Sequence, residues 1–199
     1  MNTVSCKCGI CSIKLYDTDA KLGIYCACID CRNALEWCEK HGGPKPSEIP
    51  QLIYLRSDIE SFCGANYMGA FQLRSDAKST RVYCKECFSI LGVVHPAYSD
   101  NVFMCFIGHC RLSLSNDIGP SAAIYLNDLL NKEIFKFPED LPVFYSFAYE
   151  QELKRFRQIP AVELAFNPPI EKPKGIFFQD LINSLGHIKV LNLEQGDMG

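Results

Sequence analysis

The chain has 199 residues, 48% hydrophobic and 22% charged, an ordinary composition for a globular protein with a sizeable core. Its net charge of −3 and isoelectric point near 5.8 argue against a general binder of phosphate backbones, which usually carries a basic face. The first residues form no apolar leader and no stretch approaches the length of a membrane span, so we expect a cytoplasmic protein without membrane attachment. In a reducing compartment, clustered thiols among the 12 cysteines indicate metal ligands rather than disulfides.

The first 40 residues alternate cysteine clusters with short regular segments. Cys6 and Cys8 form a chelating pair that is followed by a glycine. Apolar positions alternate on both sides of a polar break at 17–19, which predicts a β-hairpin over 12–25 that delivers Cys8 and Cys26 from opposite ends. The three cysteines of the 26–31 run come next, and 33–40 is predicted to be a short helix.

The middle of the chain has the pattern of a β-sheet. A Gly and Pro cluster at 42–46 indicates a loop. Short apolar runs then predict strands at 51–56, 61–63, 70–73, 81–83, 89–95 and 102–107. A second chelating pair, Cys84 and Cys87, follows the fourth of these strands. The fold class is therefore predicted to be mainly β, with a zinc-binding core.

The character of the sequence changes after Pro120. Helices are predicted at 121–131 and 147–157, and four prolines between 160 and 173 predict an irregular arm or linker. Apolar residues with helical spacing predict a last helix at 176–185, which Gly186 terminates. We expect one domain at 1–118 and a partly helical, proline-rich C-terminal extension at 119–199 that packs on the core and offers a homodimer or protein-partner surface.

The cysteine spacing predicts two metal sites. Each of the pairs Cys6/Cys8 and Cys84/Cys87 supplies half of a four-thiol zinc site. The run Cys26-x-Cys28-x-x-Cys31 directs three soft donors at one point and leaves one corner of a tetrahedron free. Catalytic zinc sites keep such a position for water or substrate, unless a fourth ligand arrives from elsewhere in the chain.

The ordered pattern Cys-x-Cys-Gly, Cys-x-Cys-x-x-Cys-Arg and Arg-x-Tyr-Cys-x-x-Cys resembles the glutathione-dependent formaldehyde-activating enzyme family, which includes centromere protein V. The resemblance covers roughly residues 3 to 115. It implies a tent-like β fold and two zinc ions, a structural one on the two pairs and a second on Cys26, Cys28 and Cys31. In that family the second zinc is the proposed site at which glutathione and formaldehyde combine. Ala27 and Phe88 depart from the family pattern, in which His and Gly are usual.

The resemblance implies a carbon–sulfur lyase with Cys26, Cys28 and Cys31 as the catalytic ligands. Arg32 is the candidate substrate-binding residue because a guanidinium can clamp a carboxylate of a thiol such as glutathione, whereas Arg81 is expected to be structural. Asp30 is expected to bond the backbone around the cluster rather than to carry protons. Phe88 stands where the tight turn favours a positive φ, so we expect a different turn or strain.

A second class of protein fits the same residues. In a non-catalytic zinc-stabilised binding module, Cys110, Cys11 or His109 closes the second site and the C-terminal third contacts a partner. A third candidate is a lyase that acts on a different thiol. The cysteines outside the clusters are expected to be small buried residues, namely Cys11, Cys38, Cys63, Cys105 and Cys110.

Overall fold

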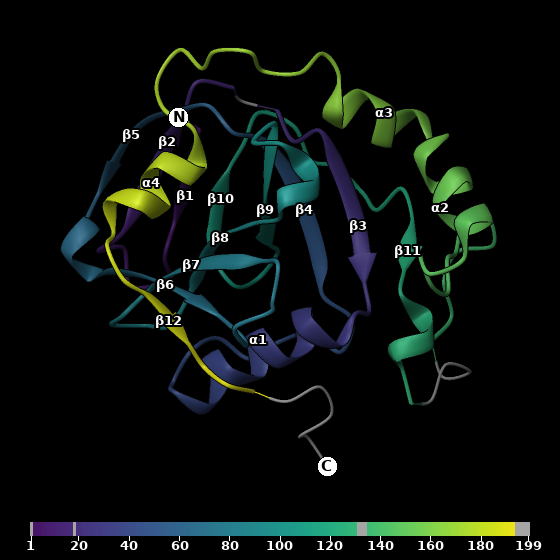
Figure 1. Ribbon diagram of the computed structural model, residues 1–199, viewed down its shortest axis with the longest axis horizontal. Coiled ribbons are helices and arrows are strands. Elements are labelled where there is room, and N and C mark those ends of the chain that lie inside the picture. The colour runs from purple at the N-terminus through teal and green to yellow at the C-terminus, as the bar shows by residue number, and fades with distance from the viewer. Residues whose placement is uncertain (1, 18, 131–134, 194–199) are drawn as a thin grey trace.

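The computed structural model describes residues 2–17, 19–130 and 135–193, and it shows two β-sheets with helices at their margins (Figure 1). The mainly β fold class with a partly helical C-terminal part is confirmed. Among the described residues, no helix combines the length and the apolar character that crossing a membrane requires.

The smaller sheet has four antiparallel strands in the order β10-β1-β2-β5. In this sheet the N-terminal strand β1 pairs with β10, which lies more than 100 residues later in the chain. Its strands are β1 (Thr3–Ser5), β2 (Ser12–Leu15), β5 (Ile59–Cys63) and β10 (Arg111–Ser113).

The larger sheet has eight strands in the order β11-β3-β4-β9-β8-β7-β6-β12. Its six inner strands are antiparallel, whereas the two edge strands join in parallel. The strands are β3 (Leu22–Cys26), β4 (Gln51–Arg56), β6 (Met68–Gln72), β7 (Thr80–Cys84), β8 (Ile90–Val94), β9 (Val102–Phe106), β11 (Ala123–Ile124) and β12 (Ile188–Val190).

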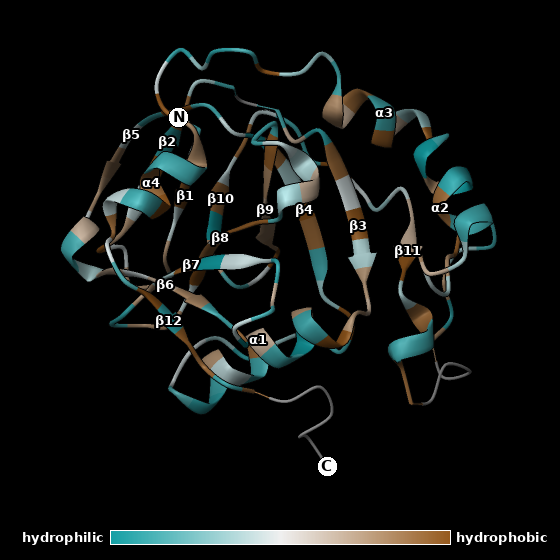
Figure 2. Cartoon of the chain, in the orientation of Figure 1, coloured by the Kyte–Doolittle hydropathy of each residue, from teal (hydrophilic) through white to brown (hydrophobic). Residues whose placement is uncertain are grey.

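Burial separates the central strands from the others. Every residue of β7, β8 and β9 is buried, which requires cover on both faces of the sheet and explains their nearly continuous apolar runs. Hydrophobic colour accordingly follows β3, β4 and β9 in Figure 2, while the outer helix α2 (Glu150–Arg157) is hydrophilic. All six strands predicted between 51 and 107 are present, with ends that differ by a few residues.

The predicted hairpin over 12–25 is wrong. Both of its strands exist, but β2 pairs with β1 and β5 in the small sheet, while β3 pairs with β4 and β11 in the large one. Alternation shows that a strand buries one face, but it does not identify the neighbouring strand. The chain between the two strands passes from one sheet to the other, and Lys21 N–H already bonds the Tyr54 carbonyl at 2.8 Å.

The helix predicted at 33–40 is longer at its N-terminus. Helix α1 spans Ile29–Lys40 and begins inside the three-cysteine run, with Cys28 at its cap. The Cys28 Sγ accepts a hydrogen bond from the Cys31 amide at 3.4 Å, so a sulfur satisfies one of the open N–H groups of the first turn. The same local structure that starts the helix therefore orients two of the three thiols.

The C-terminal part differs from the prediction in two places. Instead of a helix at 121–131, β11 pairs with β3, and a short 3₁₀ turn follows at Leu126–Asp128; residue 131 lies outside the described residues. Tyr125 has a φ of 61°, which no α-helix accommodates. Within the expected irregular arm, Pro160 begins helix α3 (Pro160–Phe166), a position where a missing N–H costs nothing.

The last predicted helix is present as α4 (Phe178–Ser184), and Gly186 follows it with a φ of 80°. Phe178 stacks on Phe103 of β9 with ring centroids 4.3 Å apart, close over Gly92 of β8. The C-terminal part thus supplies a packed helix and both edge strands of the large sheet. The expected boundary at 118 stays a prediction.

Candidate metal centres

The first cysteine cluster lies where the N-terminal segment meets the end of β7. The sulfurs of Cys6, Cys8, Cys84 and Cys87 all lie within 4.8 Å of one another. Cys6 Sγ is 3.3 Å from Cys8 Sγ, which is 3.8 Å from Cys84 Sγ. A zinc ion bound at about 2.3 Å by four thiolates holds them roughly 3.8 Å apart, so the four donors fit a tetrahedral site.

A residue with positive φ directly follows each of the two cysteine pairs in this cluster. Gly9 follows the first pair with a φ of 84°, and Phe88 follows the second with a φ of 47°. The Phe88 amide donates to the Cys84 carbonyl at 2.9 Å, and the Cys11 amide donates to the Cys6 sulfur at 3.2 Å. The expected strain at Phe88 is confirmed, because a residue with a Cβ occupies the left-handed conformation that favours glycine.

The Phe88 ring offsets this strain by packing among three aromatic side chains. It stacks on His41 at 5.2 Å and contacts Trp37 and Tyr83 at 5.6 and 5.7 Å between ring centroids. Trp37 and His41 belong to α1 and its cap, so this cluster ties the helix to the four-thiol site.

Two thiols of this cluster, those of Cys87 and Cys8, have pKa values shifted in opposite directions. Burial raises the pKa of Cys87, but hydrogen bonds from Ser89 and Cys8 outweigh it and lower the value to about 6. The Ser89 hydroxyl lies 3.2 Å from the Cys87 sulfur. A hydrogen bond with the Ile10 backbone lowers the pKa of Cys8. Burial and hydrogen bonds with the neighbouring thiols outweigh it and raise the pKa to about 12. A divalent cation is what would let all four become thiolates together.

The second cluster consists of Cys26, Cys28 and Cys31. Cys26 ends β3, while Cys28 caps α1 and Cys31 lies in its first turn. Cys26 Sγ is 3.3 Å from Cys28 Sγ and 3.7 Å from Cys31 Sγ. Among the residues described, no fourth Cys, His, Asp or Glu joins this group. Both predicted clusters can therefore hold a metal ion, one with four thiols and one with three.

Charge is distributed unevenly over the three thiols. Hydrogen bonds from Cys26 and Cys28, aided by the positive charge of Arg81, hold the pKa of the Cys31 thiol well below its usual range. The same hydrogen bonds and burial raise the pKa of Cys26 well above its usual range. Cys28 is the half-buried member, whereas Cys26 and Cys31 are buried.

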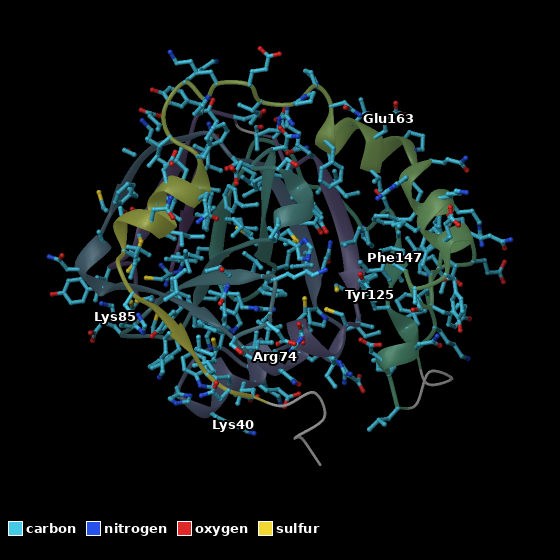
Figure 3. All side chains as sticks on the ribbon, viewed as in Figure 1. Lys40, Arg74, Lys85, Tyr125, Phe147 and Glu163 are labelled. Atoms are coloured by element: carbon cyan, nitrogen blue, oxygen red, sulfur yellow. The ribbon has the colours of Figure 1, made fainter. Side chains whose placement is uncertain are left out.

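Three tyrosines converge on the second cluster. Tyr54 of β4 and Tyr98 place their hydroxyls 3.1 Å apart, and Tyr125 packs on Phe147 at 4.9 Å between ring centroids (Figure 3). Burial raises the pKa of Tyr125, and the negative charge of the three cysteines raises it further. Sequence reasoning missed these residues because they come from distant segments and share no local pattern.

The two polar residues beside the cluster, Arg32 and Asp30, make contacts within the chain. Arg32 Nε donates to the Ala27 carbonyl at 3.1 Å, and its Nη2 donates to the Asp128 carbonyl at 2.5 Å. Its role in substrate binding stays a prediction. The Asp30 carboxylate does not bond the nearby backbone; it accepts from Arg74 Nη1 and Nη2 at 2.8 and 3.2 Å, and Figure 3 shows Arg74 beside α1.

The residues suggested as a fourth ligand lie elsewhere. Cys11 sits beside the four-thiol cluster, with its amide on the Cys6 sulfur. Cys110 Sγ contacts the Phe106 carbonyl at 3.7 Å, and His109 Nδ1 accepts from the Ile90 amide at 2.8 Å. The cysteines outside the clusters are buried as predicted, except Cys63, which is exposed on a strand of the small sheet.

Comparison with known proteins adds no assignment. No family model, no curated protein and no solved structure matches the chain. The functional proposal therefore rests on the chemistry of the two cysteine clusters.

Proposed function

We propose that the protein is a zinc-dependent carbon–sulfur lyase-type enzyme. It forms or cleaves the adduct between a thiol, such as glutathione, and a small aldehyde at Cys26, Cys28 and Cys31. The observation that carries this proposal is the three-thiol group itself, which no fourth ligand completes among the described residues. The family resemblance of the cysteine pattern points to the same reaction class.

Zinc is the metal we propose because soft thiolates select it over hard divalent cations. The four-thiol site is saturated by protein ligands and is therefore the structural one. In the three-thiol site, zinc would supply Lewis acidity and a template for an incoming thiol. Its formal charge of about −1, from one dication and three thiolates, favours ligand exchange over strong polarisation.

The chain's own residues then orient the reactants. The accessible side is next to Cys28, which is the half-buried member of the group. The aromatic rings of Tyr98 and Tyr125 form an apolar wall there, and the Tyr54–Tyr98 hydroxyl pair offers hydrogen bonds to a carbonyl oxygen. In the addition, the thiol sulfur bonds to the carbonyl carbon and the thiol proton ends on the oxygen. Arg32, which is half-buried, is the proposed contact for a substrate carboxylate.

The first experiment measures zinc content and glutathione binding by calorimetry in the wild type and in Cys28→Ala. We expect two zinc ions per chain, and loss of one zinc together with thiol binding in the variant. Cys63→Ala is the matched control, because it removes an exposed thiol outside both clusters. Cys28→Ala with unchanged zinc content and thiol binding would refute the proposal.

The alternative is a non-catalytic zinc-stabilised module whose C-terminal part contacts a protein partner or a second copy. One observation favours it: Tyr145, Tyr149 and Leu164 are large apolar residues that are 46%, 60% and 68% exposed. One zinc per chain, or two with no thiol binding, would favour this module. All 12 cysteines are free, which supports a cytoplasmic location under either function.

A further inference from the structure

Arg81 is a charged side chain in the interior of the large sheet. It lies on β7 and is only 1% exposed. Its Nη1 donates to the Ser79 carbonyl and its Nη2 to the Asp30 carbonyl, both at 3.2 Å. Its Nε has no hydrogen-bond partner among the described residues, and its guanidinium lies 5.9 Å from the centre of the Phe71 ring. All of the groups that Arg81 contacts here are uncharged.

No carboxylate compensates this charge among the described residues. The nearest acidic residue in the contacts of Arg81 is Asp30, which offers only its backbone carbonyl. The Asp30 carboxylate is bound by Arg74 at 2.8 Å. A buried ion without a counter-charge is strongly unfavourable, so a guanidinium this deep needs an anion nearby.

The three-thiol group is the anion in the right place. The Asp30 carbonyl that Arg81 holds belongs to the residue directly before Cys31, between two of the three thiols. Of the other arginines near the cluster, Arg74 is paired with both Asp30 and Asp76, and Arg32 is half-buried and donates to two backbone carbonyls.

We propose that Arg81 is the counter-ion of the metal–thiolate complex at Cys26, Cys28 and Cys31, and is thus a positioning residue rather than a structural one. This inference rests on the proposed metal site. One dication, three thiolates and one guanidinium sum to a net charge of zero. An incoming substrate thiolate then brings the site to −1 instead of −2, so Arg81 favours the binding of anionic thiolates as the fourth ligand.

The test measures zinc affinity at each site by competition with a chromophoric chelator. Arg81→Gln keeps an amide donor for one carbonyl but removes the charge, whereas Arg81→Lys keeps the charge but loses the planar fork. We expect Arg81→Gln to weaken the three-thiol site by about 10–100-fold, the range for partners of metal ligands, with the four-thiol site essentially unchanged. Arg81→Lys keeps the charge and should therefore lose less affinity at the three-thiol site than Arg81→Gln, although a lysine cannot reproduce both carbonyl bonds of the guanidinium.

Arg74→Gln is the matched control, since it removes a neighbouring arginine whose charge Asp30 and Asp76 already balance. Equal losses in Arg81→Gln and Arg81→Lys, or equal losses at both metal sites, would show a structural role and overturn the inference. If Arg81→Gln does not fold, Arg81→Lys decides alone: retained affinity supports the counter-ion, and a loss above tenfold overturns it. A wild type that binds a single zinc would instead refute the proposed function.

Discussion

The backbone at Phe88 allows a prediction in which two opposing effects can be separated. Phe88→Gly and Phe88→Ala both delete a half-buried ring that contacts Trp37, His41 and Tyr83. Partial burial is worth roughly 1–1.5 kcal/mol, and each aromatic pair adds about 0.5–1.5 kcal/mol. With three such pairs, both variants should therefore lose about 2.5–6 kcal/mol of unfolding free energy from the ring alone.

The two variants differ in the backbone. At a φ of 47°, a Cβ costs about 1–2 kcal/mol, which only glycine removes. The greater freedom of glycine in the unfolded chain offsets roughly 0.5–1 kcal/mol of this gain. We therefore expect Phe88→Gly to be more stable than Phe88→Ala by about 0.5–1 kcal/mol, although both are less stable than the wild type.

Urea unfolding followed by circular dichroism measures these differences, with free zinc buffered at one concentration because a bound metal stabilises the folded state by mass action. Circular dichroism is preferable to fluorescence because Trp37 contacts the mutated ring. Equal stabilities for the two variants, or a more stable Phe88→Ala, would refute the strain argument. A Phe88→Gly variant more stable than the wild type would refute the estimate of ring packing.

Two further predictions concern the core. Burial lowers the pKa of His109 to about 4, so between pH 6.5 and 4 the unfolded chain binds a proton that the folded chain does not. This group should destabilise the protein by about 1.4 kcal/mol per pH unit as the pH falls through that range, and His109→Asn should remove the contribution. Denaturant unfolding at several pH values gives the free energy of unfolding against pH for the wild type and for His109→Asn. Parallel curves for the two proteins would contradict the prediction. Gly92→Ala would place a Cβ against Phe178 and 2.9 Å from Phe103 Cδ2, so it should loosen α4 and cost about 1–3 kcal/mol. Limited proteolysis should then cut near α4 faster than in the wild type, and an unchanged cleavage rate would show that this helix does not depend on the contact.

Local spacing was enough to predict the two ligand sets. Cysteines two or three residues apart can reach one metal whatever the rest of the fold does, so Cys26, Cys28 and Cys31 were recognisable from sequence, as were the two pairs of the four-thiol site. The strands between 51 and 107 were predictable because their apolar runs are continuous. The strain at Phe88 was also predictable from the sequence, because the tight turn after a chelating pair favours a positive φ whatever the rest of the fold does.

Tertiary structure decided what surrounds the ligands. The sequence could not show that β2 and β3 enter different sheets, because alternation reports burial and not partners. Nor could it show that 121–131 would yield an edge strand, since pairing with β3 outweighs local helix propensity there. Arg81 and Tyr98 come to the second cluster from segments at least 50 residues away in the sequence. Only packing could determine that a buried guanidinium holds the Asp30 carbonyl between two of the thiols and that aromatic rings lie beside Cys28.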